Sequence, residues 1–161
     1  MTDLANTVAS ELSAYFEKIG AKVHKWVDPL SNEQFWRNPY SYGSSVGHLV
    51  LHLTGNLNYY IGAQIAGTGY TRDRDREFTE ANRPAKQDVL HNFDRAIQLV
   101  IDTIRKQSPE DWSAAYTAER STEKTRFAIV LGCAAHADHH AGQIIFLSRE
   151  LAKPALRSAA T

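Results

Sequence analysis

The chain has 161 residues, enough for one domain with a sizeable core, and we predict a single domain over residues 1–161. Basic and acidic residues number 18 each, so no net field favours nucleic acid or an anionic membrane as a partner. The longest wholly apolar run, residues 127–135, is about half of the roughly 20 residues that span a membrane. The first residues lack the basic-then-apolar order of a secretory signal, so we expect a cytoplasmic protein.

The chain has one cysteine, Cys133, which excludes an internal disulfide framework and a four-cysteine zinc site. If the protein binds a transition metal, histidine must therefore supply the ligands. Free cysteine is commonly a small buried hydrophobe, and we interpret Cys133 in this way, with a thiolate close to a metal as the alternative.

Four stretches carry apolar residues at steps of three and four, the period of one helix face. Asp28 and Pro29 end the first of them. Ser44 or Ser45 can cap the second, and Gly67 can close it. The sequence "SPEDW" predicts a short capped turn of helix after the third. The four stretches cover about residues 4–26, 44–66, 85–106 and 122–151.

Residues 68–84, "TGYTRDRDREFTEANRP", form a polar link that is longer than the usual 2 to 8 residues between neighbouring helices. Such a link can cross a bundle between its second and third helices instead of making a hairpin. We therefore predict an all-α protein, a four-helix bundle with a long crossover. The alternating charges from Arg72 to Phe78 predict a solvated loop, although its arginines could hold a carboxylate ligand near a pocket.

Histidines occur at helical spacing in two of the predicted helices. His136 and His140, in "HADHHAGQI", are four residues apart and so face the same way, on a stripe of apolar residues. His48 and His52, in "SVGHLVLHLTGN", repeat the spacing on the second helix. An inward imidazole must be hydrogen-bonded or bound to a metal.

Histidines from facing helices of a bundle can surround an ion. Zinc accepts three protein ligands with an open fourth position in catalytic sites, and nickel also suits imidazole. The alternative is a hydrogen-bonded core histidine. His139 lies to one side of the line that joins His136 and His140, so we interpret it as a neighbour of the site. Asn56, Tyr59 and Tyr60 follow the second-helix histidines and could line a pocket or simply pack in the core.

A di-iron centre is the rival site for a helical bundle. It needs inward glutamates and Glu-x-x-His pairs. No glutamate precedes His52, His136, His139 or His140 at that spacing, so the sequence argues against it.

The histidines at 52, 136 and 140, with the trailing "HHAGQI", resemble the pattern of the DinB/YfiT-like superfamily of metal-dependent four-helix-bundle proteins. The resemblance extends from the first helix to the last. It implies an up-down-down-up bundle, commonly a homodimer, in which His52, His136 and His140 bind a divalent ion such as zinc or nickel. His48 is the alternative ligand from the second helix.

Some members of that superfamily resemble thiol S-transferases that use bacillithiol or mycothiol. The resemblance therefore implies a small-molecule substrate and a low-molecular-weight thiol cofactor, whose thiolate is favoured at the ion. His139 or Tyr59 could assist proton transfer. Two alternatives stay open: a metal-dependent hydrolase, and a non-catalytic metal-binding stress or regulatory protein.

Overall fold

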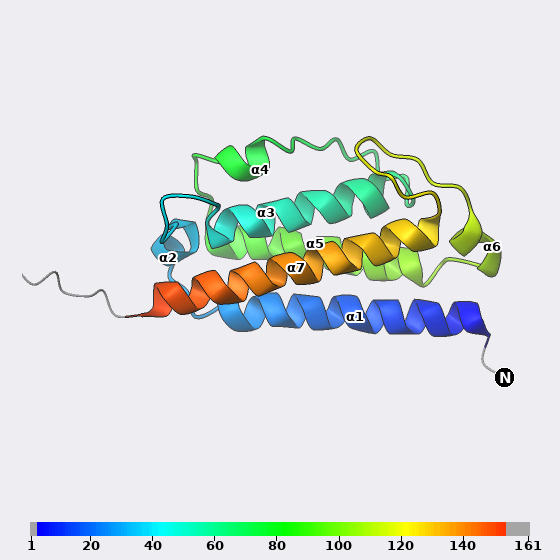
Figure 1. Ribbon diagram of the computed structural model, residues 1–161, viewed down its shortest axis with the longest axis horizontal. Coiled ribbons are helices and arrows are strands. Elements are labelled where there is room, and N and C mark those ends of the chain that lie inside the picture. The colour runs from blue at the N-terminus through cyan, green and yellow to red at the C-terminus, as the bar shows by residue number, and fades with distance from the viewer. Residues whose placement is uncertain (1–2, 154–161) are drawn as a thin grey trace, which may run out of the picture.

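Four long helices lie side by side in the computed structural model, which describes residues 3–153 (Figure 1). Residues 1–2 and 154–161 of the predicted domain lie outside the described part. Within residues 3–153 the one β contact is an isolated bridge between Ala115 and Thr125, so the predicted all-α class is confirmed. The long helices are α1 Leu4–Val27, α3 Val46–Leu57, α5 Lys86–Ile104 and α7 Arg126–Ala152.

Side-chain caps set where three of these helices begin. Asp3, Ser45 and Thr125 each accept a hydrogen bond from a backbone N–H two or three residues further on. Such bonds satisfy donors that the first turn of a helix leaves without an intrahelical partner. Ser45, and not Ser44, therefore begins the second long helix. Because Thr125 is the cap, the fourth long helix begins slightly later than predicted.

The second long helix changes its hydrogen-bond pattern partway. α3 ends at Leu57 and continues as the π-helix η1, Asn58–Ala63, where the sequence predicted one α-helix over residues 44–66. The N–H of Gln64 donates to the carbonyl of Tyr59, five residues earlier, at 3.2 Å. A π-helical turn holds an extra residue, so it shifts the side chains that follow around the helix axis.

Three short helices lie between the long ones: α2 Asn32–Trp36, α4 Arg76–Thr79 and α6 Pro109–Ser113. The sequence predicted α6 but neither α2 nor α4. A capping box starts α2, in which Ser31 and Gln34 each bond the backbone N–H of the other. The pattern Ser-x-x-Gln was therefore the available signal for α2.

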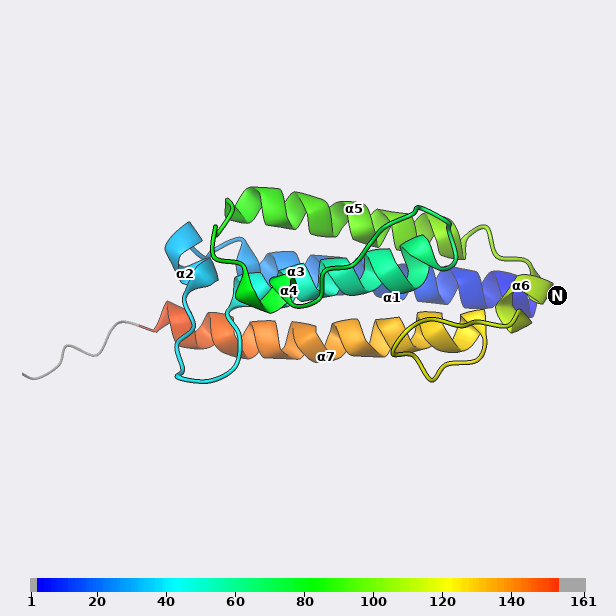
Figure 2. The ribbon, with the colours of Figure 1, turned by 90° about the horizontal axis from the view of Figure 1, so that it is seen from above.

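The long helices run in two directions. α3 and α5 point the same way, and α1 and α7 point the opposite way (Figures 1 and 2). α1 packs against α5 and α7, and α3 packs against the same two helices. The link from η1 to α5 therefore returns along the length of α3, and α4, which belongs to this link, packs on α3.

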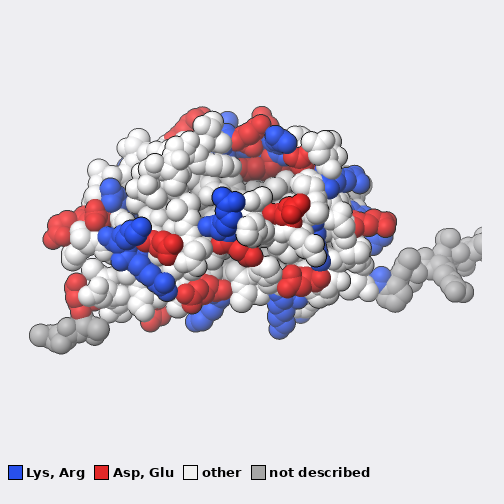
Figure 3. Space-filling view, turned by 180° about the vertical axis from the view of Figure 1, so that it is seen from behind, with Lys and Arg blue, Asp and Glu red and all other residues white. Residues whose placement is uncertain are grey.

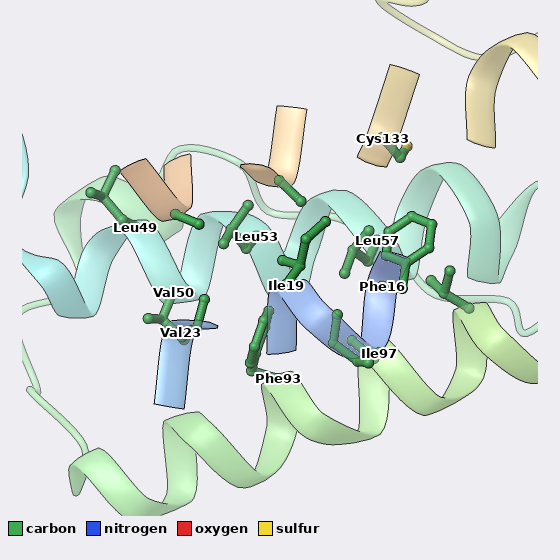
Figure 4. Packing of buried hydrophobic residues seen from close by; sticks show 14 of the residues in the cluster. Phe16, Ile19, Val23, Leu49, Val50, Leu53, Leu57, Phe93, Ile97 and Cys133 are labelled. Carbon is green, nitrogen blue, oxygen red and sulfur yellow. The ribbon is translucent and has the colours of Figure 1, made fainter. Parts of the chain in front are cut away.

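Apolar side chains from all four long helices fill the core (Figure 4). Burying each large apolar side chain stabilises the fold by about 1.5 to 3 kcal/mol before conformational entropy is counted. Because each helix contributes a stripe, the core fixes how the helices are rotated about their axes. The largest fully buried side chains are those of Phe16, Ile19, Val23, Val27, Phe35, Leu53, Leu57, Ile61, Phe93, Ile104, Ile144 and Leu151.

One face of α7 is made of small residues. Ala134, Ala137 and Ala141 are at most 1% exposed, whereas His136 and His140 are half-buried at the edge of this face. Small side chains let helices approach closely, and α7 makes its most extensive contacts with α1. The two histidines therefore lie at the border of the core, beside α3. The sequence predicted them on the central buried stripe of α7.

Acidic and basic side chains are interspersed on the face shown in Figure 3, which agrees with the balanced composition of the chain. No helix among residues 3–153 combines the length and the apolar character that crossing a membrane requires.

The contact between α2 and α3 makes a prediction about two helical glycines. A Cβ on Gly47 would stand 2.6 Å from the ring of Trp36, which is fixed by a hydrogen bond to Pro84, whereas a Cβ on Gly142 meets nothing within 4 Å. We expect Gly47→Ala to lower the free energy of unfolding by about 1–3 kcal/mol through overpacking. We expect Gly142→Ala, the matched control, to raise it by up to about 1 kcal/mol through helix propensity. Urea denaturation measures both; equal effects would contradict the packing at Trp36.

Candidate metal centre

Three imidazoles converge between α3 and α7. His52 comes from α3, and His136 and His140 come from successive turns of α7. The Nε2 atoms of His52 and His136 are 3.0 Å apart, and the ring centroids of the three histidines lie 4.4 to 5.0 Å from one another. Each ring offers a nitrogen atom within 4.8 Å of the other two. The three histidines, which we call the histidine cluster, lie close enough to bind one metal ion.

The spacing fits a divalent ion. Zinc–nitrogen bonds of about 2.0 to 2.1 Å at tetrahedral angles place two ligand nitrogens about 3.3 Å apart. The 3.0 Å between the Nε2 atoms of His52 and His136 needs only a small adjustment to reach that value. Among residues 3–153, no cysteine, aspartate, glutamate or further histidine joins the cluster. Three protein ligands with an open fourth position are typical of catalytic zinc sites, whereas structural sites are closed.

A buried ion pair orients His52. Oε2 of Glu77 lies 2.8 Å from Nδ1 of His52, and Arg72 donates two hydrogen bonds to the same carboxylate, at 2.7 and 2.9 Å. An ionised carboxylate only accepts hydrogen bonds, so Nδ1 of His52 must carry the proton. Nε2 then has its lone pair free and directed into the histidine cluster. Carboxylates commonly orient metal-binding histidines in this way.

The surroundings of Glu77 agree with this assignment. Burial alone raises the pKa of Glu77, but the hydrogen bonds from His52 and Arg72 outweigh burial and hold the pKa below its ordinary value. The carboxylate is therefore ionised at neutral pH. The side chains of Arg72 and Glu77 are only 9% and 7% exposed.

The prediction of a solvated loop from Arg72 to Phe78 is therefore wrong at Arg72, Glu77 and Phe78. The Phe78 ring packs 4.8 Å from the His52 ring, between centroids. A charged link can bury two of its side chains when they neutralise each other and find further partners. The prediction fails because the further partner of Glu77 is His52, which is distant in sequence although it is adjacent in the fold.

Gly55 leaves the space that the Glu77 carboxylate occupies. A Cβ at this position of α3 would lie 2.0 Å from Oε1 of Glu77. An isolated glycine within a helix lowers helix stability, so it commonly has a packing or functional reason. Gly55, three residues after His52, was therefore the sequence signal for this contact.

The other two cluster histidines are also prepared to present lone pairs. Burial, together with smaller contributions from the adjacent His140, His52 and Arg72, lowers the pKa of His136 to about 4. Burial also lowers the pKa of His140, against an opposing hydrogen bond from its side chain to Gln143. Nδ1 of His140 lies 2.6 Å from Oε1 of Gln143, so this amide oxygen holds a proton on Nδ1. Nε2 of His140 is then the nitrogen that is free to bind.

Two further histidines that the sequence placed near the site, His48 and His139, lie outside the cluster. His48 is one turn before His52, but its Nδ1 lies 2.8 Å from Oγ of the cap Ser45, and its ring packs edge-on against Trp36. The ring centroid of His139 is 5.2 Å from that of His140, but His139 does not belong to the group of three. Neither histidine contributes a nitrogen to the group of three.

The other candidate residues divide between the site and its surroundings. Asn56 is 7% exposed and lines a cavity beside His52. Tyr60 lines the same cavity, whereas Tyr59 lines a smaller neighbouring hollow that Tyr60 also lines. Cys133 is 2% exposed, and burial raises its pKa to about 12, so it is a protonated thiol at neutral pH, as predicted for a buried hydrophobe.

The histidine cluster lies between two cavities. The first, of about 500 Å³, is lined by His52 and His136 and by polar groups, and we call it the polar cavity. The second, of about 540 Å³, is lined by His140 and by aromatic rings, and we call it the aromatic cavity. A larger cavity of about 820 Å³ between α3, α5 and the link contains no histidine, so we do not place the site there. The polar groups are Asn56, Tyr60, Arg72, Arg74, Arg120, Ser121, Thr122 and Glu123, and the rings are Tyr40, Tyr42, Phe78 and Phe146.

The contact between Glu77 and His52 predicts the tautomer of His52. We expect long-range ¹H–¹⁵N spectra of the metal-free protein to show the proton on Nδ1. Glu77→Gln, and Gly55→Ala, which displaces the carboxylate, should move population toward the Nε2-protonated form because the ionised acceptor is lost or moved. Glu80→Gln is the matched control, since Glu80 belongs to the same link but pairs with Arg76. A His52 tautomer unchanged in both Glu77→Gln and Gly55→Ala would contradict the assignment.

One family model matches the chain over residues 3–160, and it is described as "Protein of unknown function (DUF1572)". No curated protein and no solved structure matches the chain. Because the matched residues are nearly the whole sequence, the chain belongs to the DUF1572 family.

Proposed function

We propose that the protein is a metal-dependent enzyme with a DinB/YfiT-like four-helix bundle, and that it transfers a small thiol to an electrophilic small molecule. The ligands of the ion, zinc or nickel, would be His52, His136 and His140. The observation that carries the proposal is the place of the histidine cluster at the boundary of two cavities of different chemistry.

Two cavities favour a transfer between two ligands over hydrolysis. A hydrolase needs one organic ligand and a water molecule at the ion, whereas a transferase must hold two organic ligands beside the reacting atoms. Here the polar cavity touches the cluster at His52 and His136, and the aromatic cavity touches it at His140. The polar cavity suits the thiol, and the aromatic cavity suits an apolar electrophile.

When bound, a divalent ion would supply Lewis acidity that favours the thiolate form of a coordinated thiol. The chain's own residues would orient a ligand of the ion, accept a proton and exclude water. Glu77 keeps Nε2 of His52 directed into the cluster through its bond to Nδ1. Glu123, the one carboxylate among the described residues lining the polar cavity, would accept the proton of the incoming thiol. The rings of Phe78 and Phe146 would exclude water from the electrophile.

The first experiment measures bound metal in the purified protein and its variants. We expect about one zinc or nickel ion per chain in the wild type, and a loss of at least tenfold in occupancy in His136→Ala, because removing one of three ligands leaves too few. His139→Ala is the matched control, since it removes a neighbouring imidazole outside the cluster. Unchanged stoichiometry in His136→Ala, or equal losses in both variants, would contradict the site.

The second experiment tests transfer. The metal-loaded protein is incubated with a fluorogenic electrophile and, in turn, with bacillithiol, mycothiol, glutathione and coenzyme A. We expect conjugation with at least one thiol, and its loss after chelation and in His136→Ala. If the ion binds but no thiol is conjugated, the transferase is wrong and a non-catalytic metal-binding protein becomes the better interpretation.

A further inference from the structure

We propose that the polar cavity binds a small organic carboxylate that carries one negative charge and a hydrogen-bond donor, and that Arg74, Arg120 and Asn56 recognise it. One part of this inference rests on the proposed function, namely that the bound carboxylate reacts at the histidine cluster. The cavity, its charges and its unpaired amide are features of the fold that stand without a bound ion.

The charge balance of the polar cavity favours an anion. Its lining contains three arginines and one glutamate, Glu123. Arg72 is neutralised by the buried carboxylate of Glu77, to which it donates two hydrogen bonds. Of the remaining charged residues in the lining, Arg74 and Arg120 are positive and Glu123 is negative, while Asp73, Asp75 and Glu119 line a neighbouring hollow with the two arginines. The excess of about one positive charge matches a monocarboxylate better than a doubly charged phosphate.

The two remaining guanidinium groups have no strong partner among the described residues. Arg74 lies over the ring of Phe78, 5.4 Å from its centroid, and makes no salt bridge within residues 3–153. Arg120 has Nε 3.7 Å from a carboxylate oxygen of Glu119, but the two side chains are 65% and 79% exposed, so this pair is weak. Both arginines are therefore free to hold a ligand carboxylate.

Asn56 supplies the second, independent observation. It is 7% exposed, lines the polar cavity, and its Oδ1 accepts no hydrogen bond from any group within residues 3–153. A buried amide oxygen without a hydrogen-bond partner is destabilising, so such groups are uncommon. A small rotation of the Asn56 side chain, which lines the cavity, would let a ligand hydroxyl or amide N–H satisfy this oxygen. The ligand must then combine a carboxylate for the arginines with a donor for Asn56.

The test uses 2-, 3- and 4-hydroxybutyrate as probes, because they place a hydroxyl at increasing distance from a carboxylate. Affinity is measured by ¹H–¹⁵N chemical-shift titration of the purified protein, before and after chelation of metal. We expect at least one acid to bind at the polar cavity in both samples, and the corresponding uncharged amide to bind at least tenfold more weakly. If none of the acids binds, or if acid and amide bind equally, the inference is overturned.

Variants distinguish specific recognition of the acid in the polar cavity from a general effect of the protein's positive charge. The double variant R74Q/R120Q should weaken binding of the acid at least tenfold, whereas Arg76→Gln, which removes an arginine of the same link outside the polar cavity, should leave it unchanged. Asn56→Leu should reduce the affinity of the hydroxy acid to that of butyrate. Equal weakening in the double variant and in Arg76→Gln would overturn the assignment, as would an unaltered preference for the hydroxy acid in Asn56→Leu.

The probes carry no thiol, and one arm of the test has no metal, so this experiment does not depend on thiol transfer. If a carboxylate binds but no thiol is conjugated, the transferase hypothesis is wrong and the assignment of the polar cavity is still supported. If instead none of the acids binds, and thiol conjugation is the same in R74Q/R120Q as in the wild type, the cavity assignment is wrong and the transferase stands.

Discussion

The hydrogen bond between Glu77 and His52 connects the link before α5 to the interior of the protein, and the site depends on it. A buried carboxylate is stable only when its charge is compensated. Here Arg72 from the same link and His52 from α3 provide that compensation together. The bond therefore fixes the path of the link as well as the direction of an imidazole. Arg74, which lines the polar cavity, and Phe78, which lines the aromatic cavity, belong to the same link and lie close to this contact in sequence.

The arrangement of α7 explains why the histidines meet at an edge of the core. Ala134, Ala137 and Ala141 are at most 1% exposed, so these small residues, and not the histidines, form the buried middle of the helix. His136 and His140 lie beside these alanines, next to α3 and the two cavities. A cluster in the centre of the core would be closed to ligands, whereas this position leaves His136 and His140 half-buried at the edge of two cavities.

How far the sequence predicts this protein depends on the range of the interactions involved. The spacing of His136 and His140 is local helix geometry, and the all-α class and the long helices follow from periodicity in the same way. The π-helix η1 and the burial of Glu77 depend on contacts between distant segments, which periodicity does not contain. Gly55 was readable as an unexplained helical glycine, but its partner Glu77, 22 residues later, was not.

The position of Cys133 bears on the open coordination position that the proposed reaction requires. Cys133 lines the polar cavity one turn before His136, and a protein thiolate at the ion would occupy the place that an incoming thiol needs. Its sulfur does not join the histidine cluster. Burial also raises its pKa to about 12, so the thiol keeps its proton. Helical position and burial would therefore act together to leave the fourth position of a bound ion available to a ligand from outside the chain.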